Sequence, residues 1–71
     1  MALEVPIRGE EIRLGQLLKL AGVAASGGEA RQLLERGEVS VNGTTETRRG
    51  RKLRAGDVVS VAGEQLRVSV S

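Results

Sequence analysis

The chain must build its hydrophobic core from aliphatic side chains alone, because it contains no Phe, Tyr or Trp. Leu, Val, Ile and Ala therefore have to supply the apolar burial, and their spacing decides which segments can form helices or strands. With 71 residues the chain has room for one domain, and a domain of this size buries only about 60% of its unfolded surface. We therefore predict a single domain over residues 1–71.

Two helices are predicted in the first half of the chain. The first has apolar residues at i, i+3, i+4 and i+7, followed by a glycine that suits a left-handed C-terminal cap. These residues are Leu14, Leu17, Leu18, Ala21 and Gly22. The second helix begins with the spacing of a capping box, in which Ser26 and Glu29 each satisfy a backbone N–H at the helix start. Its predicted buried stripe consists of Ala30, Leu33 and Leu34.

After Gly37, which should end the second helix, the apolar period changes from about 3.6 residues to 2, as expected for strands. Strands are predicted there at residues 39–41, 44–47, 58–62 and 66–70, and a further strand at residues 3–8, where Leu3, Val5 and Ile7 alternate with polar residues and Pro6. Asn42-Gly43 indicates a tight hairpin turn, and further turns are predicted at 55–57 and 63–64. Pro6 places the first strand at an edge, because proline cannot donate to a ladder. The predicted fold class is α+β, with two short helices packed on a small, mostly antiparallel, twisted sheet.

Positive charge is concentrated in residues 48–54, which we call the basic segment. Five of the eleven Lys and Arg residues lie there, namely Arg48, Arg49, Arg51, Lys52 and Arg54. The other six face nine acidic residues, so the rest of the chain carries a net charge of −3. A polyanion would therefore be drawn to one place on the surface, and Leu53 should anchor the segment in the core. A solvated charged loop and a nuclear-import signal are the other interpretations of the same residues.

The available side chains give little support for catalysis. The chain has neither His nor Cys, which disfavours a zinc site and removes the usual near-neutral bases and thiol nucleophiles. The Glu residues are scattered, and we expect them on solvent-facing surfaces. We predict that the protein is not an enzyme and uses no metal, cofactor or small-molecule substrate. No stretch approaches the ~20 apolar residues of a membrane helix, and no signal peptide is recognised, so we predict a cytoplasmic protein without membrane contact.

The start of the second helix allows two interpretations. The run from Ser26 through Gly27 and Gly28 to Glu29 could dock a phosphate on free backbone N–H groups. It could equally be a plain helix cap, which the negative charge of Glu29 favours. Arg31 is similarly open, since it could pair with a Glu four residues on or face the basic segment.

Two longer stretches carry a family resemblance. Residues 26–43 read SGGEARQLLERGEVSVNG, and residues 53–59 read LRAGDVV. They resemble the RNA-binding domain of ribosomal small-subunit protein four, the S-four domain, whose hallmark is S-x-x-x-A-x-x-L-I-x-x-G, then V-x-V-N-G and a G-D turn. The resemblance covers about residues 12–68. Residues 46–53, ETRRGRKL, are similar to the small standalone bacterial members of the YaaA/YbcJ-like type.

The resemblance implies an alpha-L-like RNA-binding fold and a ribosome-associated role in translation. Carried over by position, the RNA-facing set is Ser26, Gly27, Gly28, Arg31, Gln32, Asn42 and Gly43, joined by Arg48, Arg49, Arg51 and Lys52. Many family members have a basic or aromatic residue at the start of the second helix. The glycines found there in this chain predict contact through the backbone instead.

We therefore predict a module that binds structured RNA, ribosomal or transfer RNA, through phosphate contacts from the basic segment and the start of the second helix. A ribosomal particle is one setting in which it would act. Without aromatic side chains the usual platform for stacking bases is absent, so phosphates and shape should supply the affinity, and only Arg guanidinium planes could stack on an exposed base. The alternatives are a protein-interaction module on a ribosome-associated partner, and DNA binding, because phosphate contacts do not distinguish the sugar.

Overall fold

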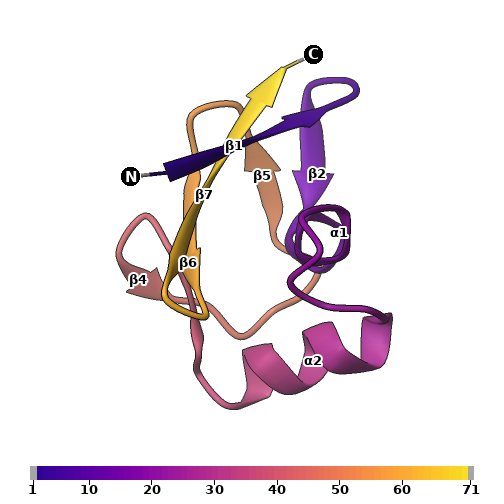
Figure 1. Ribbon diagram of the computed structural model, residues 1–71, viewed down its shortest axis with the longest axis vertical. Helices are drawn as coiled ribbons and strands as arrows, with labels where there is room; N and C mark the ends of the chain where they lie inside the picture. Colours follow the sequence, from indigo (N-terminus) through magenta and orange to yellow (C-terminus); the bar gives the residue numbers. More distant parts are fainter. Residues whose placement is uncertain (1, 71) are drawn as a thin grey trace.

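The computed structural model describes residues 2–70 and has the predicted α+β architecture (Figure 1). Its elements are β1 (Ala2–Ile7), β2 (Glu11–Arg13), α1 (Leu14–Leu20), α2 (Gly27–Glu35), β3 (Val39–Val41), β4 (Thr44–Thr45), β5 (Lys52–Arg54), β6 (Val58–Val61) and β7 (Glu64–Val70). Five strands form one sheet in the order β1-β7-β6-β3-β4, and β2 pairs with β5 in a separate two-stranded ribbon. Within residues 2–70, no helix is long and apolar enough to cross a membrane.

The five-stranded sheet is antiparallel except at one edge, where β1 runs parallel to β7. Pro6 therefore lies on an edge strand, as predicted. Val5 and Ile7 of β1 point into the core, whereas Leu3 is 55% exposed. The predicted alternation of this strand is thus correct for its second half only.

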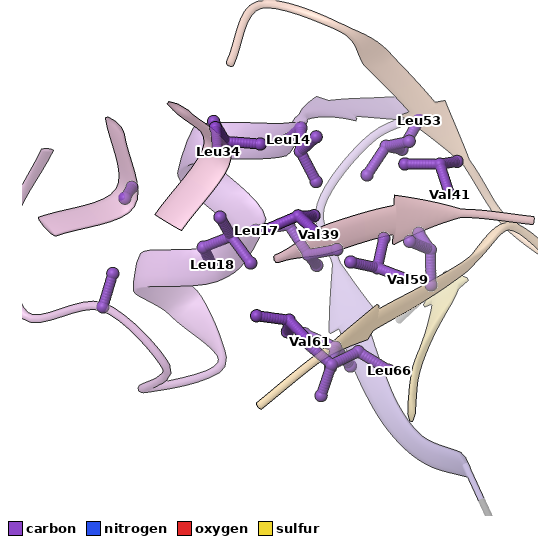
Figure 2. Close-up of a cluster of buried hydrophobic side chains, with 14 of the residues drawn as sticks. Leu14, Leu17, Leu18, Leu34, Val39, Val41, Leu53, Val59, Val61 and Leu66 are labelled. Atoms are coloured by element: carbon purple, nitrogen blue, oxygen red, sulfur yellow. The ribbon is translucent and has the colours of Figure 1, made fainter. Parts of the chain in front are cut away.

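The core lies between the helices and one face of the sheet, and aliphatic side chains fill it (Figure 2). Leu14, Leu17 and Leu18 of α1 are fully buried, as their spacing predicted. The buried residues of α2 are Ala30 and Leu34. Leu33, predicted to share this stripe, is only partly buried against the core. The sheet contributes Val39, Val41, Val59, Val61, Leu66 and Val68.

The N-terminal cap of α2 forms half of the predicted capping box. The Ser26 hydroxyl accepts a hydrogen bond from the Glu29 backbone N–H at 3.2 Å. The Glu29 carboxylate, however, accepts from the N–H of Ala25 at 3.3 Å, one residue before the position that a capping box requires. The helix ends as predicted, with Gly37 in the left-handed conformation at φ 72°.

The hairpin turns depend on consecutive residues with positive φ. Asn42 and Gly43 have φ values of 51° and 86° and connect β3 to β4, as predicted. The turn between β6 and β7 was predicted at residues 63–64, but it consists of Ala62 and Gly63, with φ values of 54° and 77°. The prediction was one residue late because alanine rarely adopts this conformation and so gives no turn signal.

The basic segment is a strand in its second half, which corrects the expectation that it forms a loop between strands. Lys52–Arg54 is β5, and it pairs antiparallel with β2 over three residues. Neither strand was predicted, because each offers a single apolar residue and therefore shows no periodicity. Leu53 opposes Ile12 in this ribbon and is fully buried, so its predicted role as an anchor is confirmed.

The anchor can be tested by shortening its side chain. We expect Leu53→Ala to lower the free energy of unfolding by about 2–5 kcal/mol, because it leaves a cavity in a core without aromatic residues. Leu20→Ala is the matched control, since Leu20 is 57% exposed, and it should change stability by no more than about 0.5 kcal/mol. Urea unfolding of both variants measures the difference. Equal losses in the two variants would contradict the anchoring role.

Candidate nucleic-acid interface

The basic segment is fastened to the start of α1 through the main chain. The N–H of Leu14 donates to the carbonyl oxygen of Arg51 at 2.8 Å, and the N–H of Gly15 donates to that of Arg49 at 2.9 Å. The first N–H groups of a helix have no partner inside the helix, so an external segment has to satisfy them. The two segments are far apart in sequence, but these bonds place residues 49–51 directly against α1.

Gly15 allows this close approach. A Cβ atom at position 15 would lie 3.3 Å from the Cβ of Arg49 and 3.5 Å from its carbonyl oxygen. The first of these contacts is tighter than most Cβ contacts and the second is an ordinary van der Waals contact, so a side chain at position 15 would require Arg49 to shift slightly. Glycine inside a helix costs about 0.5–1 kcal/mol relative to alanine, and the contact with Arg49 is a physical reason for its presence.

Glu46 lies directly before the basic segment and is buried, which corrects the expectation that the Glu residues face solvent. One carboxylate oxygen, Oε2, accepts from the N–H groups of Thr47 and Arg48 at 3.0 and 3.1 Å and from Arg48 Nε at 3.2 Å. The other, Oε1, accepts from Arg48 Nη2 at 3.3 Å and from Arg51 Nη1 at 3.0 Å. No sequence periodicity marks this position, because β4 ends at Thr45.

These hydrogen bonds fix the charge state of the carboxylate. The Arg48 side chain, the Arg48 backbone N–H and the Arg51 side chain lower the pKa of Glu46 from 4.5 to about 2. The carboxylate in turn raises the pKa of Arg48. At neutral pH the pair is therefore fully ionised.

Ion pairing divides the cations of residues 2–70 into two groups. Six have an acidic partner within 4.0 Å: Arg31, Arg36, Arg48, Arg51, Lys52 and Arg67. The other five have none in this part of the chain: Arg8, Arg13, Lys19, Arg49 and Arg54. A cation without a protein partner is the kind that can neutralise a phosphate without first breaking an ion pair.

Three of these unpaired cations meet in one surface depression of about 320 Å³. Its lining consists of Arg13, Gly15, Gln16, Lys19, Gly27, Ala30, Arg49 and Gly50. These residues come from the junction of β2 and α1, the outer face of α1, the first turns of α2 and the basic segment. No acidic residue lines the depression, so its electrostatic potential is set by Arg13, Lys19 and Arg49.

Sequence reasoning anticipated part of this depression. The predicted contact set contains Gly27 and Arg49, which both line it, but not Arg13, Gln16 or Lys19. The missing signal was present, because residues three apart lie on one helix face. These three form a polar stripe at positions 13, 16 and 19, and that stripe borders the depression.

The remaining predicted residues lie around the depression or away from it. Both interpretations of Arg31 are correct, since it pairs with Glu35 at 3.3 Å and lines an adjoining hollow with Arg49. Lys52 lies 3.9 Å from Glu11 across the β2–β5 ribbon. Gln32 and Gly28 are exposed on α2.

Asn42 and Gly43 occupy the β3–β4 turn and do not line the depression. The Asn42 side chain donates to Asp57 at 3.1 Å and accepts from the N–H of Val58 at 2.9 Å. Asp57 also accepts from the N–H of Arg54 at 2.8 Å, which confirms its predicted role in a turn. The side chains of Asn42 and Asp57 thus tie two turns together.

The comparisons with known proteins agree with this fold. The S4 domain family model matches residues 5–69, and the chain belongs to that family. It is 52% identical over 63 residues to "probable ribosome maturation protein RlbA" of Bacillus subtilis (strain 168), covering 89% of each chain. The solution structure of Escherichia coli YbcJ, described as revealing an αL motif involved in RNA binding, superposes with a TM-score of 0.68 at 34% identity, over 99% of this chain and 92% of YbcJ.

A third relative is an enzyme that this chain matches over a small part of its length. The chain is 38% identical over 61 residues to tyrosine–tRNA ligase of Burkholderia lata, which is 86% of this chain but 15% of the ligase. The match is thus confined to a small part of the enzyme. The S4 domain is an RNA-binding type of domain and not an enzymatic one. The resemblance identified in the sequence is therefore confirmed at the level of the family.

The Glu46 carboxylate predicts a specific acid sensitivity. Its pKa is lowered on folding, so it stabilises the folded state above its ordinary pKa of 4.5, and this stabilisation is lost as the pH falls toward 2. We expect the melting temperature of the parent protein to fall more steeply over this range than that of Glu46→Gln. Glu35→Gln, which removes a carboxylate from an exposed pair, should retain the slope of the parent. Parallel curves for the parent and Glu46→Gln would contradict the assignment.

Proposed function

We propose that residues 1–71 act as one RNA-binding domain that holds structured RNA, ribosomal or transfer RNA, through contacts with its phosphates. The observation that carries this proposal is the meeting of Arg13, Lys19 and Arg49 in a depression without acidic residues. Within residues 2–70 none of the three has an ion-pair partner. The family of the chain supports RNA as the polyanion.

The chemistry of the depression suits a phosphate group. The guanidinium groups of Arg13 and Arg49 can each grip phosphate oxygens with two parallel hydrogen bonds, whereas the Lys19 ammonium acts as a compact charge. Gly27 belongs to the first turn of α2, where backbone N–H groups lack helical partners and can add to an anion contact. Arg48, Arg51 and Lys52 belong to the same basic segment as Arg49 and would supply further attraction at longer range.

The mode of recognition follows from the absence of aromatic residues. Proteins that read single-stranded RNA usually stack bases on Phe, Tyr or Trp, and this chain has none. Phosphate contacts fix position and orientation but carry little sequence information. We therefore propose that the domain recognises the shape of a folded or double-stranded element.

The setting and the further contacts are part of the same proposal. Ribosomal and transfer RNA place the protein in the cytoplasm, and the name of RlbA supports a ribosomal particle as the site of action. The domain would contribute affinity without a catalytic step. Of the predicted contact residues outside the depression, Ser26, Gly28 and Gln32 belong to α2 and its cap and would add contacts beside Gly27. Asn42 and Gly43, at the β3–β4 turn, would contact RNA that extends beyond the depression.

Removing single cations tests the proposed site. We expect Arg49→Ala and Arg13→Ala each to weaken binding of a fluorescently labelled RNA hairpin by about threefold to tenfold, because each deletes a charge-assisted phosphate contact. Arg67→Ala is the control of equal charge, since Arg67 pairs with Glu4 on strand β1 and lies outside the depression. Fluorescence anisotropy gives the three affinities. Equal effects of all three substitutions would indicate net charge alone and reject the site.

The dependence of RNA affinity on salt concentration measures how many phosphates the protein neutralises. Three neutralised phosphates predict a slope of log affinity against log salt of about −2 to −3, and five predict about −4. Affinity that does not change with salt would refute phosphate binding. Competition with an RNA duplex and a DNA duplex of the same sequence then separates RNA from DNA binding, and we expect the RNA duplex to compete better because the domain reads A-form shape.

One observation favours the second candidate function, a protein-interaction module. Leu20 is 57% exposed and, with Pro6, Ile7 and Ile12, lines an open depression of about 560 Å³ beside the cationic one. Proteins captured from a bacterial lysate should be released by nuclease if RNA binding is the function. Partners that survive nuclease treatment and are lost on Leu20→Ser would instead support protein binding.

A further inference from the structure

The six residues between β4 and β5 belong to no strand, and the Glu46 side chain accepts hydrogen bonds from backbone N–H groups that have no neighbouring strand. β4 ends at Thr45 and β5 begins at Lys52. The loop is entered through a bond from the Glu46 N–H to the carbonyl oxygen of Val39 at 2.9 Å. The next two N–H groups, those of Thr47 and Arg48, both donate to the Glu46 carboxylate. Glu46 thus organises the backbone that leads into the basic segment.

Glu46 is also the one charged residue that is buried within residues 2–70. Its side chain is 8% exposed, whereas that of Arg48 is 76% exposed. A buried carboxylate is tolerated only when hydrogen bonds compensate for the loss of water, and five such bonds reach Glu46. Removing its charge would therefore release several groups at once rather than one ion pair.

The geometry around Glu46 divides the arginines of the basic segment. Arg48 and Arg51 turn their guanidinium groups onto the carboxylate, at 3.2 and 3.0 Å. Arg49 lies between them, has no partner within residues 2–70, and lines the cationic depression. Its carbonyl oxygen is held by the N–H of Gly15. Arg48 and Arg51 therefore hold the loop through Glu46, and Arg49 is left to line the depression.

We propose that Glu46 is a positioning residue for RNA binding: it holds the 46–51 loop in the conformation that presents Arg49 to a phosphate. This inference rests on the proposed function and adds an acidic residue to an otherwise basic binding surface. Glu46 itself does not contact RNA. It acts by ordering Arg49 in advance, so that binding does not have to restrict the loop.

The proposal predicts that Glu46→Gln weakens RNA binding, whereas the change in net charge alone would strengthen it. Glu46→Gln makes the chain one unit more positive and frees Arg48 and Arg51, so electrostatic attraction alone would strengthen binding to a polyanion. Loss of the ordered loop would weaken it, because Arg49 would have to be immobilised on binding. We expect the second effect to be larger, with affinity for the RNA hairpin falling about fivefold.

A double-mutant cycle separates positioning from a general effect on stability. Affinity for the labelled hairpin is measured for the parent, Glu46→Gln, Arg49→Ala and the double variant, at a temperature where amide NMR spectra show that all four are folded. We expect Glu46→Gln to cost about fivefold when Arg49 is present and less than about twofold when it is absent. Glu35→Gln, the matched control, removes one acidic charge from the exposed pair with Arg31 and should not weaken binding.

The outcomes distinguish this inference from the function on which it rests. If the parent does not bind the hairpin, or Arg49→Ala binds as tightly as the parent, the proposed function is wrong. If Arg49→Ala binds weakly but Glu46→Gln binds as tightly as the parent or more tightly, only the positioning role is wrong. An equal loss with and without Arg49 also overturns it. Should Glu46→Gln unfold, the cycle is run with Glu46→Asp, whose shorter side chain cannot hold all five donors, and an equal loss in both backgrounds again overturns the proposal.

Discussion

Two main-chain hydrogen bonds, from the start of α1 to the carbonyl oxygens of Arg49 and Arg51, determine the rest of the binding surface. They satisfy N–H groups that a helix cannot satisfy itself, and they bring the basic segment to a helix that precedes it by more than thirty residues. These bonds allow Arg13, at the end of β2, and Lys19, on α1, to share a depression with Arg49. Gly15 permits this contact because it has no Cβ atom to press on Arg49. The β2–β5 ribbon aligns the two segments.

The acidic residues define the surface as much as the basic ones do. Every cation that faces an acidic partner has part of its charge neutralised, and the unpaired cations remaining around the depression form a smaller and better localised cluster than the sequence suggests. Glu46 makes the point most clearly, because a negative charge inside a basic region orders the loop that carries Arg49. The density of positive charge in a sequence therefore does not show which arginines lack an acidic partner and can bind a phosphate.

The helices, the main strands and the family were predictable because their signals are periodic or local. Leu14, Leu17 and Leu18 follow helical spacing, and Asn42-Gly43 has the chemistry of a type of hairpin turn that needs two positive φ angles. The β2–β5 ribbon was not, because it depends on pairing between distant segments that leaves no pattern in either one. The burial of Glu46 was not either, because its partners lie within five residues of it in a loop, where no periodicity marks a buried position. For the site, Gly27 on α2 and Arg49 in the basic segment were predicted, and the lining residues on α1 and directly before it were missed.

The borders of the five-stranded sheet also have a consequence for how the protein behaves in solution. An exposed strand edge is a template on which another chain can add a strand, and such edges are a common origin of aggregation. Here one border is β4, which is only two residues long, and the other is β1, where Pro6 removes a donor. Neither border offers a continuous row of hydrogen-bonding groups. A small domain with a marginal aliphatic core can thus be kept at high concentration without its sheets joining edge to edge.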